Sequence, residues 1–71
     1  MVKKWRILLN MTQKEFAGYF NIPLQTVQHW EQGFRHPPKY VVDLIERVMI
    51  AEHLCTEKEL KEVKRNAEDY S

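Results

Sequence analysis

Residues 12–33 most constrain how this chain of 71 residues can fold. Thr12 is followed three residues later by Glu15, a capping box in which each side chain satisfies a backbone N–H group at the start of a helix. Met11 and Phe16 have the spacing of the hydrophobic contact that often accompanies such a start. A helix is therefore predicted to begin just after Thr12.

The end of that helix and the start of the next are also marked. Asn21 tolerates the left-handed conformation that a helix end often requires, and Pro23 disfavours helical geometry at Ile22. A second helix is predicted over residues 24–32, ended by Gly33, because glycine adopts the left-handed conformation without strain. Residues 12–33 therefore predict two short helices joined by a tight turn.

Each of these two helices has one apolar stripe. Phe16 and Phe20 are four residues apart, and Val27 and Trp30 are three apart, so both pairs can face a shared interior. The remaining face of the second helix carries residues of the kind that read base edges in the DNA major groove. These candidate base-contacting residues are Leu24, Gln25, Thr26, Gln28 and His29.

These residues resemble the Cro/C1-type helix-turn-helix, also called the XRE family. The resemblance rests on residues 11–17, on the Asn21-Ile22 turn, and on residues 26–33 followed by Arg35 and Pro37. It covers residues 3 to about 54, and it implies an all-α fold, a compact lambda-repressor-like bundle of five short helices. Helices two and three would form the helix-turn-helix, and the partner would be double-stranded DNA.

The resemblance also implies roles for single residues outside the second helix of the motif. Gln13 is similar to the family's phosphate-anchoring glutamine. Arg6 could touch a phosphate, but in the family a basic residue here commonly pairs with the acidic residue after the aromatic residue of the recognition helix, here Glu31. We therefore expect a structural Arg6–Glu31 ion pair.

Among the candidate base readers, the two glutamines stand out. The primary amides of Gln25 and Gln28 can each pair with adenine N7 and N6, and Leu24 could contact a thymine methyl group. His29 could reach a base or a phosphate, and Thr26 a phosphate or a methyl group. An ordinary solvated helix face is the alternative for all of these positions.

Residues 34–38 are predicted to form a loop, because Pro37 disfavours helical geometry before it and Pro38 suits the first turn of a following helix. Arg35, Lys39 and the backbone N–H groups at the start of that helix could bind a DNA phosphate. A solvated basic loop is the alternative for Arg35.

Three further helices are predicted around this unit. The first covers the other two, ends near Asn10 and has an apolar face of Val2, Trp5, Leu8 and Leu9. The longest is expected over residues 40–54, with apolar residues at Val41, Leu44, Ile45, Val48, Ala51 and Cys55. A broad apolar face of this kind needs more than one neighbour.

A last helix is predicted over about residues 57–69. Thr56 and Glu59 form a second capping box, and the apolar residues of the helix are Leu60, Val63, Ala67 and Tyr70. Their spacing gives a narrow seam that could pack on the core or join a second copy. We expect packing combined with a homodimer through helices four and five, in a single domain of residues 1–71.

The charge distribution agrees with DNA binding on the first part of the chain. The net charge is only +1, but residues 1–40 hold six basic and two acidic residues, whereas residues 41–71 hold five basic and eight acidic residues. The positive part coincides with the predicted helix-turn-helix, which is the polarity that a DNA-facing surface needs.

The sequence favours no enzyme, cofactor or metal site. His29, His36, His53 and Cys55 lack metal-ligand spacing, and His53 and Cys55 are expected on different faces of one helix, with Cys55 as a small core residue. The sequence contains no glycine-rich phosphate loop, and no apolar stretch is long enough for a membrane span or a signal peptide. A cytoplasmic location is therefore expected.

Two functions agree with these patterns. The first is sequence-specific DNA binding by a transcriptional regulator that acts as a repressor. The alternative is a protein-interaction module, such as an antitoxin, that holds a toxin-like partner through its C-terminal helices.

Overall fold

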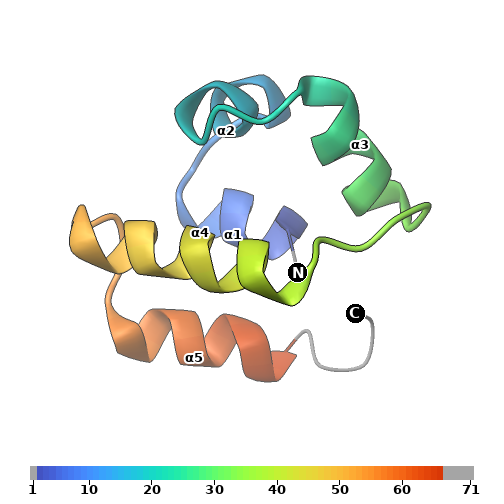
Figure 1. Ribbon diagram of the computed structural model, residues 1–71. Coiled ribbons are helices and arrows are strands. Elements are labelled where there is room, and N and C mark those ends of the chain that lie inside the picture. The colour runs from blue at the N-terminus through green and yellow to red at the C-terminus, as the bar shows by residue number, and fades with distance from the viewer. Residues whose placement is uncertain (1, 67–71) are drawn as a thin grey trace.

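The structure is a computed structural model that describes residues 2–66. Over these residues it contains five helices and no strand (Figure 1): α1 (Val2–Leu8), α2 (Gln13–Tyr19), α3 (Leu24–Gln32), α4 (Lys39–Ala51) and α5 (Glu57–Asn66). The predicted all-α fold of five short helices is confirmed. Figure 1 shows α2 and α3 on one side of α1 and α4, with α5 along the opposite side of α4.

The four helices α1 to α4 meet in one hydrophobic core. Each contributes one fully buried large side chain, namely Trp5, Phe16, Val27 and Met49, and Leu60 of α5 is also buried. Burying an apolar side chain of this size stabilises a fold by about 1.5–3 kcal/mol. Because α1 packs against both α3 and α5, it lies between the helix-turn-helix and the C-terminal helix.

The predicted signals at the start and at the end of α2 are confirmed. The Thr12 N–H group donates to Glu15 Oε1 at 2.8 Å, and the Glu15 N–H group donates to Thr12 Oγ1 at 3.1 Å. Asn21 adopts a left-handed φ of 57°, and the Ile22 N–H group donates to the Ala17 carbonyl at 2.8 Å. The capping box therefore fixes the start of α2, and the interactions of Asn21 and Ile22 fix the turn between α2 and α3.

The boundaries of α4 differ from the prediction. The helix begins at Lys39, after Pro38, which therefore precedes the first turn instead of occupying it. It ends at Ala51, because His53 takes a left-handed φ of 58° and the Leu54 N–H group donates to the Met49 carbonyl. His53 and Cys55 therefore lie in the loop before α5, and the expectation that they share one helix was wrong.

The apolar stripe predicted for α4 was also partly wrong. Ile45 and Met49 are buried, whereas Leu44 and Ala51 are exposed. The helix is apolar around much of its circumference, so periodicity alone could not indicate which side meets α1 and α5. Cys55 is half-buried and packs against the core, and burial raises the pKa of its thiol.

The second predicted capping box begins α5, where Thr56 and Glu59 exchange backbone and side-chain hydrogen bonds of 2.8 and 3.1 Å. Leu60 is buried and Val63 is half-buried, as the predicted seam requires. Ala67, Tyr70 and the expected helix end near residue 69 lie outside the described residues. None of the helices in residues 2–66 has the length and apolar character needed to cross a membrane.

Candidate nucleic-acid interface

An ion pair joins α3 to α1. Arg6 Nε lies 2.9 Å from Glu31 Oε2, and Arg6 Nη2 lies 3.0 Å from Glu31 Oε1. Burial opposes ionisation of Glu31, but hydrogen bonds from Arg6 and Gln13 and the positive charges of Arg6 and Lys3 outweigh it, so the pKa of Glu31 is lowered. The hydrogen bond to Glu31 raises the pKa of Arg6. Both groups are charged at neutral pH.

Gln13 belongs to the same network. Its Nε2 donates to Glu31 Oε1 at 3.2 Å, and Arg6 Nη1 donates to the Met11 carbonyl at 3.2 Å. The network therefore connects α1, the start of α2 and α3. Because one amide hydrogen of Gln13 is held by Glu31, the orientation of its side chain is restricted, and its remaining polar atoms are free of partners among the described residues.

The predicted base-contacting residues lie on the side of α3 that does not face the core. Leu24 and Gln25 are exposed, and Gln28, His29 and Thr26 are half-buried. On the opposite side, Val27 is fully buried, and Trp30 packs against the core. The core contacts and the Glu31 ion pair therefore fix which face of α3 is presented to solvent.

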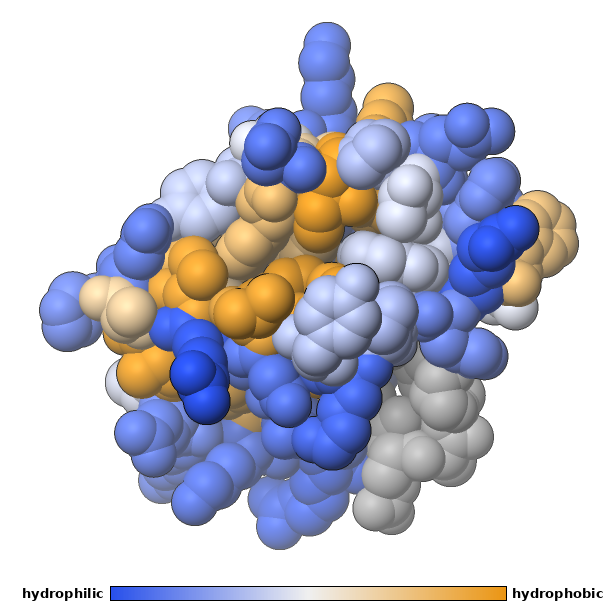
Figure 2. Space-filling view, viewed as in Figure 1, coloured by the Kyte–Doolittle hydropathy of each residue, from blue (hydrophilic) through white to orange (hydrophobic). Residues whose placement is uncertain are grey.

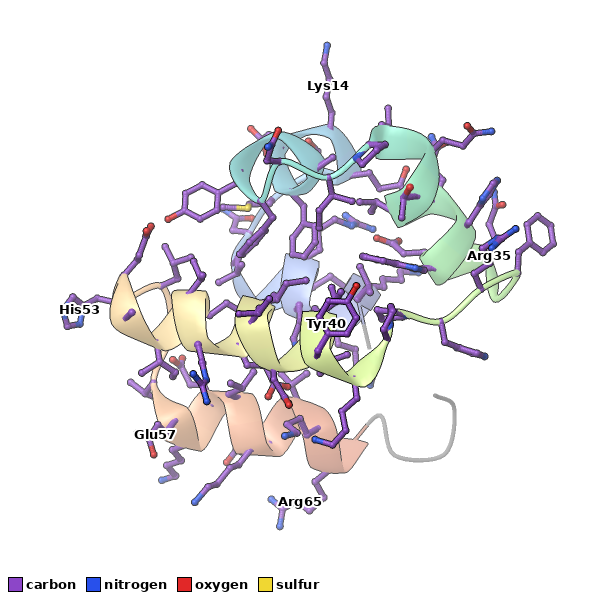
Figure 3. All side chains as sticks on the ribbon, viewed as in Figure 1. Lys14, Arg35, Tyr40, His53, Glu57 and Arg65 are labelled. Atoms are coloured by element: carbon purple, nitrogen blue, oxygen red, sulfur yellow. The ribbon has the colours of Figure 1, made fainter. Side chains whose placement is uncertain are left out.

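The loop after α3 turns back along the helix. Gly33 has a left-handed φ of 84°, and the N–H groups of Phe34 and Arg35 donate to the His29 carbonyl at 3.0 and 3.4 Å. The ring of Phe34, which is 72% exposed, lies 5.8 Å from the His29 ring. Figure 3 shows Arg35 beside the C-terminal end of α3.

A groove separates this loop from α3. We call it the loop groove; its lining residues are Thr26, His29, Trp30, Arg35, His36 and Pro38. The groove brings together three of the predicted site residues, Thr26, His29 and Arg35. It also contains His36, which the sequence analysis considers only as a possible metal ligand. The position of His36 between Arg35 and two prolines was the sequence signal that could have identified it.

Lys39 does not line the loop groove. Its Nζ lies 3.3 Å from Asp43 Oδ2, and it borders a neighbouring hollow with Glu31, His36 and Lys64. Arg35 and Lys39 therefore flank the loop without lining one shared groove. The backbone N–H groups of Val41 and Val42 already donate to the Pro38 carbonyl.

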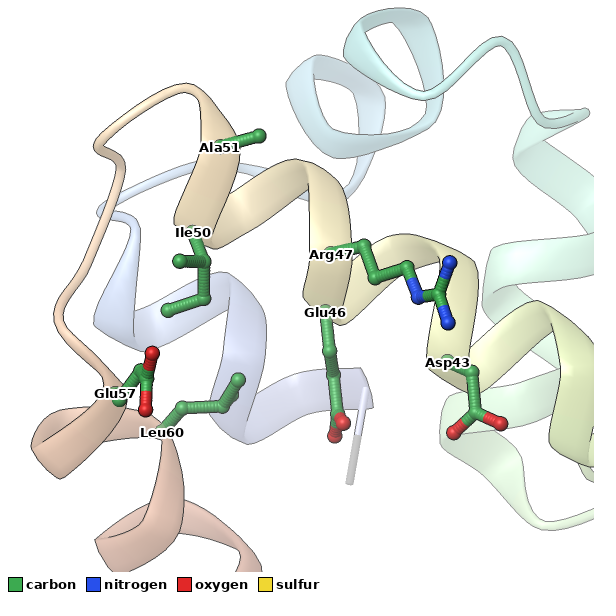
Figure 4. A pocket seen from close by; sticks show the side chains of 7 residues that line it. All are labelled: Asp43, Glu46, Arg47, Ile50, Ala51, Glu57 and Leu60. Atoms are coloured by element: carbon green, nitrogen blue, oxygen red, sulfur yellow. The ribbon is translucent and has the colours of Figure 1, made fainter.

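Two other surface features lie away from α3. A hollow between α4 and α5 is lined by three carboxylates, Asp43, Glu46 and Glu57, together with Arg47 (Figure 4). Its charge disfavours a nucleic acid there. Among residues 2–66, the structure brings no three His, Cys, Asp or Glu side chains into an arrangement that could hold a metal ion.

An apolar area occupies the face in Figure 2, over α4 and the neighbouring part of α2. Tyr40 and Leu44, one turn apart on α4, are 68% and 55% exposed. Tyr19 at the end of α2 is also exposed, and its hydroxyl donates to a Glu52 carboxylate oxygen, which raises the pKa of Tyr19. The helical periodicity predicted Leu44 in the core and so did not indicate this surface.

Comparison with known proteins identifies one family. A family model described as helix-turn-helix matches residues 2–50, which include α1, α2, α3 and nearly all of α4. No curated protein and no solved structure matches the chain significantly.

Proposed function

The chain belongs to the Cro/C1-type helix-turn-helix family of DNA-binding domains, and from this we propose that it binds double-stranded DNA in a sequence-specific manner as a transcriptional repressor. In this proposal α3 enters the major groove. The protein acts by occupying its site and carries out no catalysis, and its location is the cytoplasm, where the DNA is accessible.

One observation carries the proposal: the Arg6–Glu31 ion pair and the buried Val27 leave Gln25 and Gln28 directed away from the core. A primary amide can donate to adenine N7 and accept from adenine N6, so a rigidly held glutamine can distinguish one base pair from another. Leu24, exposed at the start of the helix, is suited to a thymine methyl group. We assign base reading to these three residues first.

Phosphate contacts on both sides of α3 would fix its orientation in the groove. Gln13 lies at the N-terminus of α2, where its amide is oriented by Glu31 and the free backbone N–H groups attract anions. Arg35 lies in the loop that follows the C-terminal end of α3, and Lys39 is the first residue of α4. Such contacts determine register and orientation, whereas base contacts determine sequence preference.

We also propose a homodimer, and we place its interface on the exposed face of α4. A two-fold dimer uses the same surface on both copies, so a patch without charge, such as Tyr40 and Leu44, can face itself without repulsion. The outer face of α5 carries Lys58, Lys61, Glu62 and Arg65 and is less suited to such contact. Two copies of α3 would read an inverted repeat.

The exposed apolar face of α4 also favours a second candidate function. A partner protein of the toxin type could cover Tyr40 and Leu44 in place of a second copy. In that case, the chain would serve as an antitoxin, and it would remain monomeric until the partner bound. DNA binding by the complex would then depend on the partner.

Selection of bound fragments from a random duplex library, at near-physiological salt, tests these functions. Enrichment of an inverted repeat would support a dimeric, sequence-specific regulator and would give the half-site spacing. Enrichment of a single short site would support sequence-specific binding by a monomer. A protein that is folded by circular dichroism but enriches no sequence would contradict the proposed regulator and favour the partner-binding module.

A further inference from the structure

The loop groove combines four side chains that can donate hydrogen bonds to an anion. Thr26 and His29 come from α3, and Arg35 and His36 come from the loop that follows it. None of the carboxylates in the described part of the chain lines the groove. Within residues 2–66, none of these four side chains has a hydrogen-bond partner, so their donors are available to a ligand.

The groove has a fixed shape because the loop is fastened to the helix. The left-handed Gly33 turns the chain, and the Phe34 and Arg35 N–H groups both bind the His29 carbonyl. Thr26 and His29 lie three residues apart on the same flank of α3, next to the proposed base readers. A ligand in the groove would therefore lie along the flank of α3, in reach of the Thr26 and His29 side chains.

We infer that the loop groove binds one backbone phosphate of duplex DNA, held by Arg35 and by protonated His29 and His36, so that DNA binding takes up protons. This inference rests on the proposed function, and it assigns Thr26 and His29 to the phosphate instead of to a base. A phosphate offers several acceptor oxygens and a negative charge, which suit guanidinium, imidazolium and hydroxyl donors.

The charged groups around the two histidines give the direction of the pH effect. His29 faces Arg35 and His36 in the groove, and both of these are donors. His36 also borders the hollow that contains Glu31, Lys39, Asp43 and Lys64. In that hollow Glu31 is paired with Arg6 and Asp43 with Lys39. In the absence of DNA, therefore, no unpaired carboxylate of residues 2–66 lines the groove or the hollow beside His29 and His36.

The phosphate supplies the missing negative charge. Histidine is the side chain that ordinarily changes charge between pH 5 and pH 8. A bound phosphate favours the protonated form, and linkage then requires that DNA affinity rises as the pH falls. Two such groups would raise the affinity about tenfold between pH 7.5 and pH 6.0.

The test measures the dissociation constant of a fluorescein-labelled 30-base-pair duplex of mixed sequence at pH 6.0 and 7.5, at constant low ionic strength. Low salt permits sequence-independent binding, to which a phosphate contact contributes fully. The variants are His29→Gln, His36→Gln and the double variant. The control is His53→Asn, because His53 is exposed at the opposite end of the molecule (Figure 3), and asparagine tolerates its left-handed backbone.

We expect the wild type and His53→Asn to bind about tenfold more tightly at pH 6.0, and the double variant to bind equally at both pH values. Unchanged thermal unfolding of the variants would show that the fold is retained. Binding that is independent of pH in the wild type, or a pH effect that persists in the double variant, would overturn the inference while leaving the proposed function intact. Absence of binding at both pH values would overturn both.

Discussion

Arg6 and Glu31 lie 25 residues apart in the sequence, yet they form a bidentate ion pair with N–O distances of 2.9 and 3.0 Å. Their side chains are only 18% and 7% exposed. A carboxylate with so little access to water needs a charged partner, because desolvation disfavours an isolated charge. The pair therefore determines how α3 is seated on α1.

Replacing Arg6 with Ala should destabilise the fold by about 2–3 kcal/mol, because it leaves the carboxylate of Glu31 buried without a charged partner. Glu31→Gln should lower the free energy of unfolding by less, since a neutral amide at this half-buried position needs no charged partner. Urea unfolding of the wild type, the two single variants and the double variant measures the interaction free energy between Arg6 and Glu31. If the effects of the two changes simply add, the ion pair does not stabilise the fold.

The Arg6–Glu31 ion pair also predicts that the stability of the fold decreases at acidic pH. The ordinary pKa of Glu31 is 4.5, and in the folded state it is lower. The folded state therefore binds fewer protons, so the stabilisation by Glu31 is complete above about pH 4.5 and is lost as the pH falls through the folded pKa. Between pH 7 and pH 3, the melting temperature of wild type should fall further than that of Glu31→Gln. Parallel decreases in the two proteins would contradict this.

The two glycines should respond in opposite directions to alanine. Gly18 lies in α2, and a methyl group added there would meet no side chain or neighbouring element within 4 Å, so Gly18→Ala should stabilise the protein by about 0.5–1 kcal/mol. Gly33 has a φ of 84°, so Gly33→Ala should destabilise it by about 1 kcal/mol or more. Thermal unfolding of the two variants checks both signs, and a loss of stability in Gly18→Ala would show that the helix needs glycine there.

Base reading by α3 predicts a change in sequence preference. Gln25→Ala or Gln28→Ala should cost about 1–3 kcal/mol on the selected site and relax the choice of base at one position. Arg35→Ala should weaken binding to all duplexes alike. Equal losses on every duplex from the Gln25 and Gln28 changes would contradict their assignment to bases.

The proposed dimer predicts that a charge on α4 separates the copies. Leu44→Lys should convert the dimer to a monomer, because it places two like charges at the two-fold interface, whereas Lys61→Ala on α5 should have no effect. Sedimentation measures the mass, and the wild-type half-sites should lie about 34 Å apart. A wild type that is monomeric at high concentration would rule out this dimer and favour a partner protein on α4.

The sequence by itself determined the parts of the fold that depend on neighbouring residues. The Thr12–Glu15 and Thr56–Glu59 capping boxes, the left-handed Asn21 and the left-handed Gly33 are local interactions within a few residues of the chain. Their energies do not depend on the rest of the fold, so the starts of α2 and α5 and the end of α3 could be predicted.

Only the tertiary structure decided which apolar residues of α4 are buried. It also decided which side chains from different segments of the chain lie close together. Leu44 and Ile45 are apolar neighbours, but Ile45 is buried in the hydrophobic core, whereas Leu44 is exposed. The sequence likewise contained Thr26, His29, Arg35 and His36 without showing that they line one groove, because that depends on how the loop folds back on α3. Packing between helices is set by shape over the whole core, and no short segment contains that information.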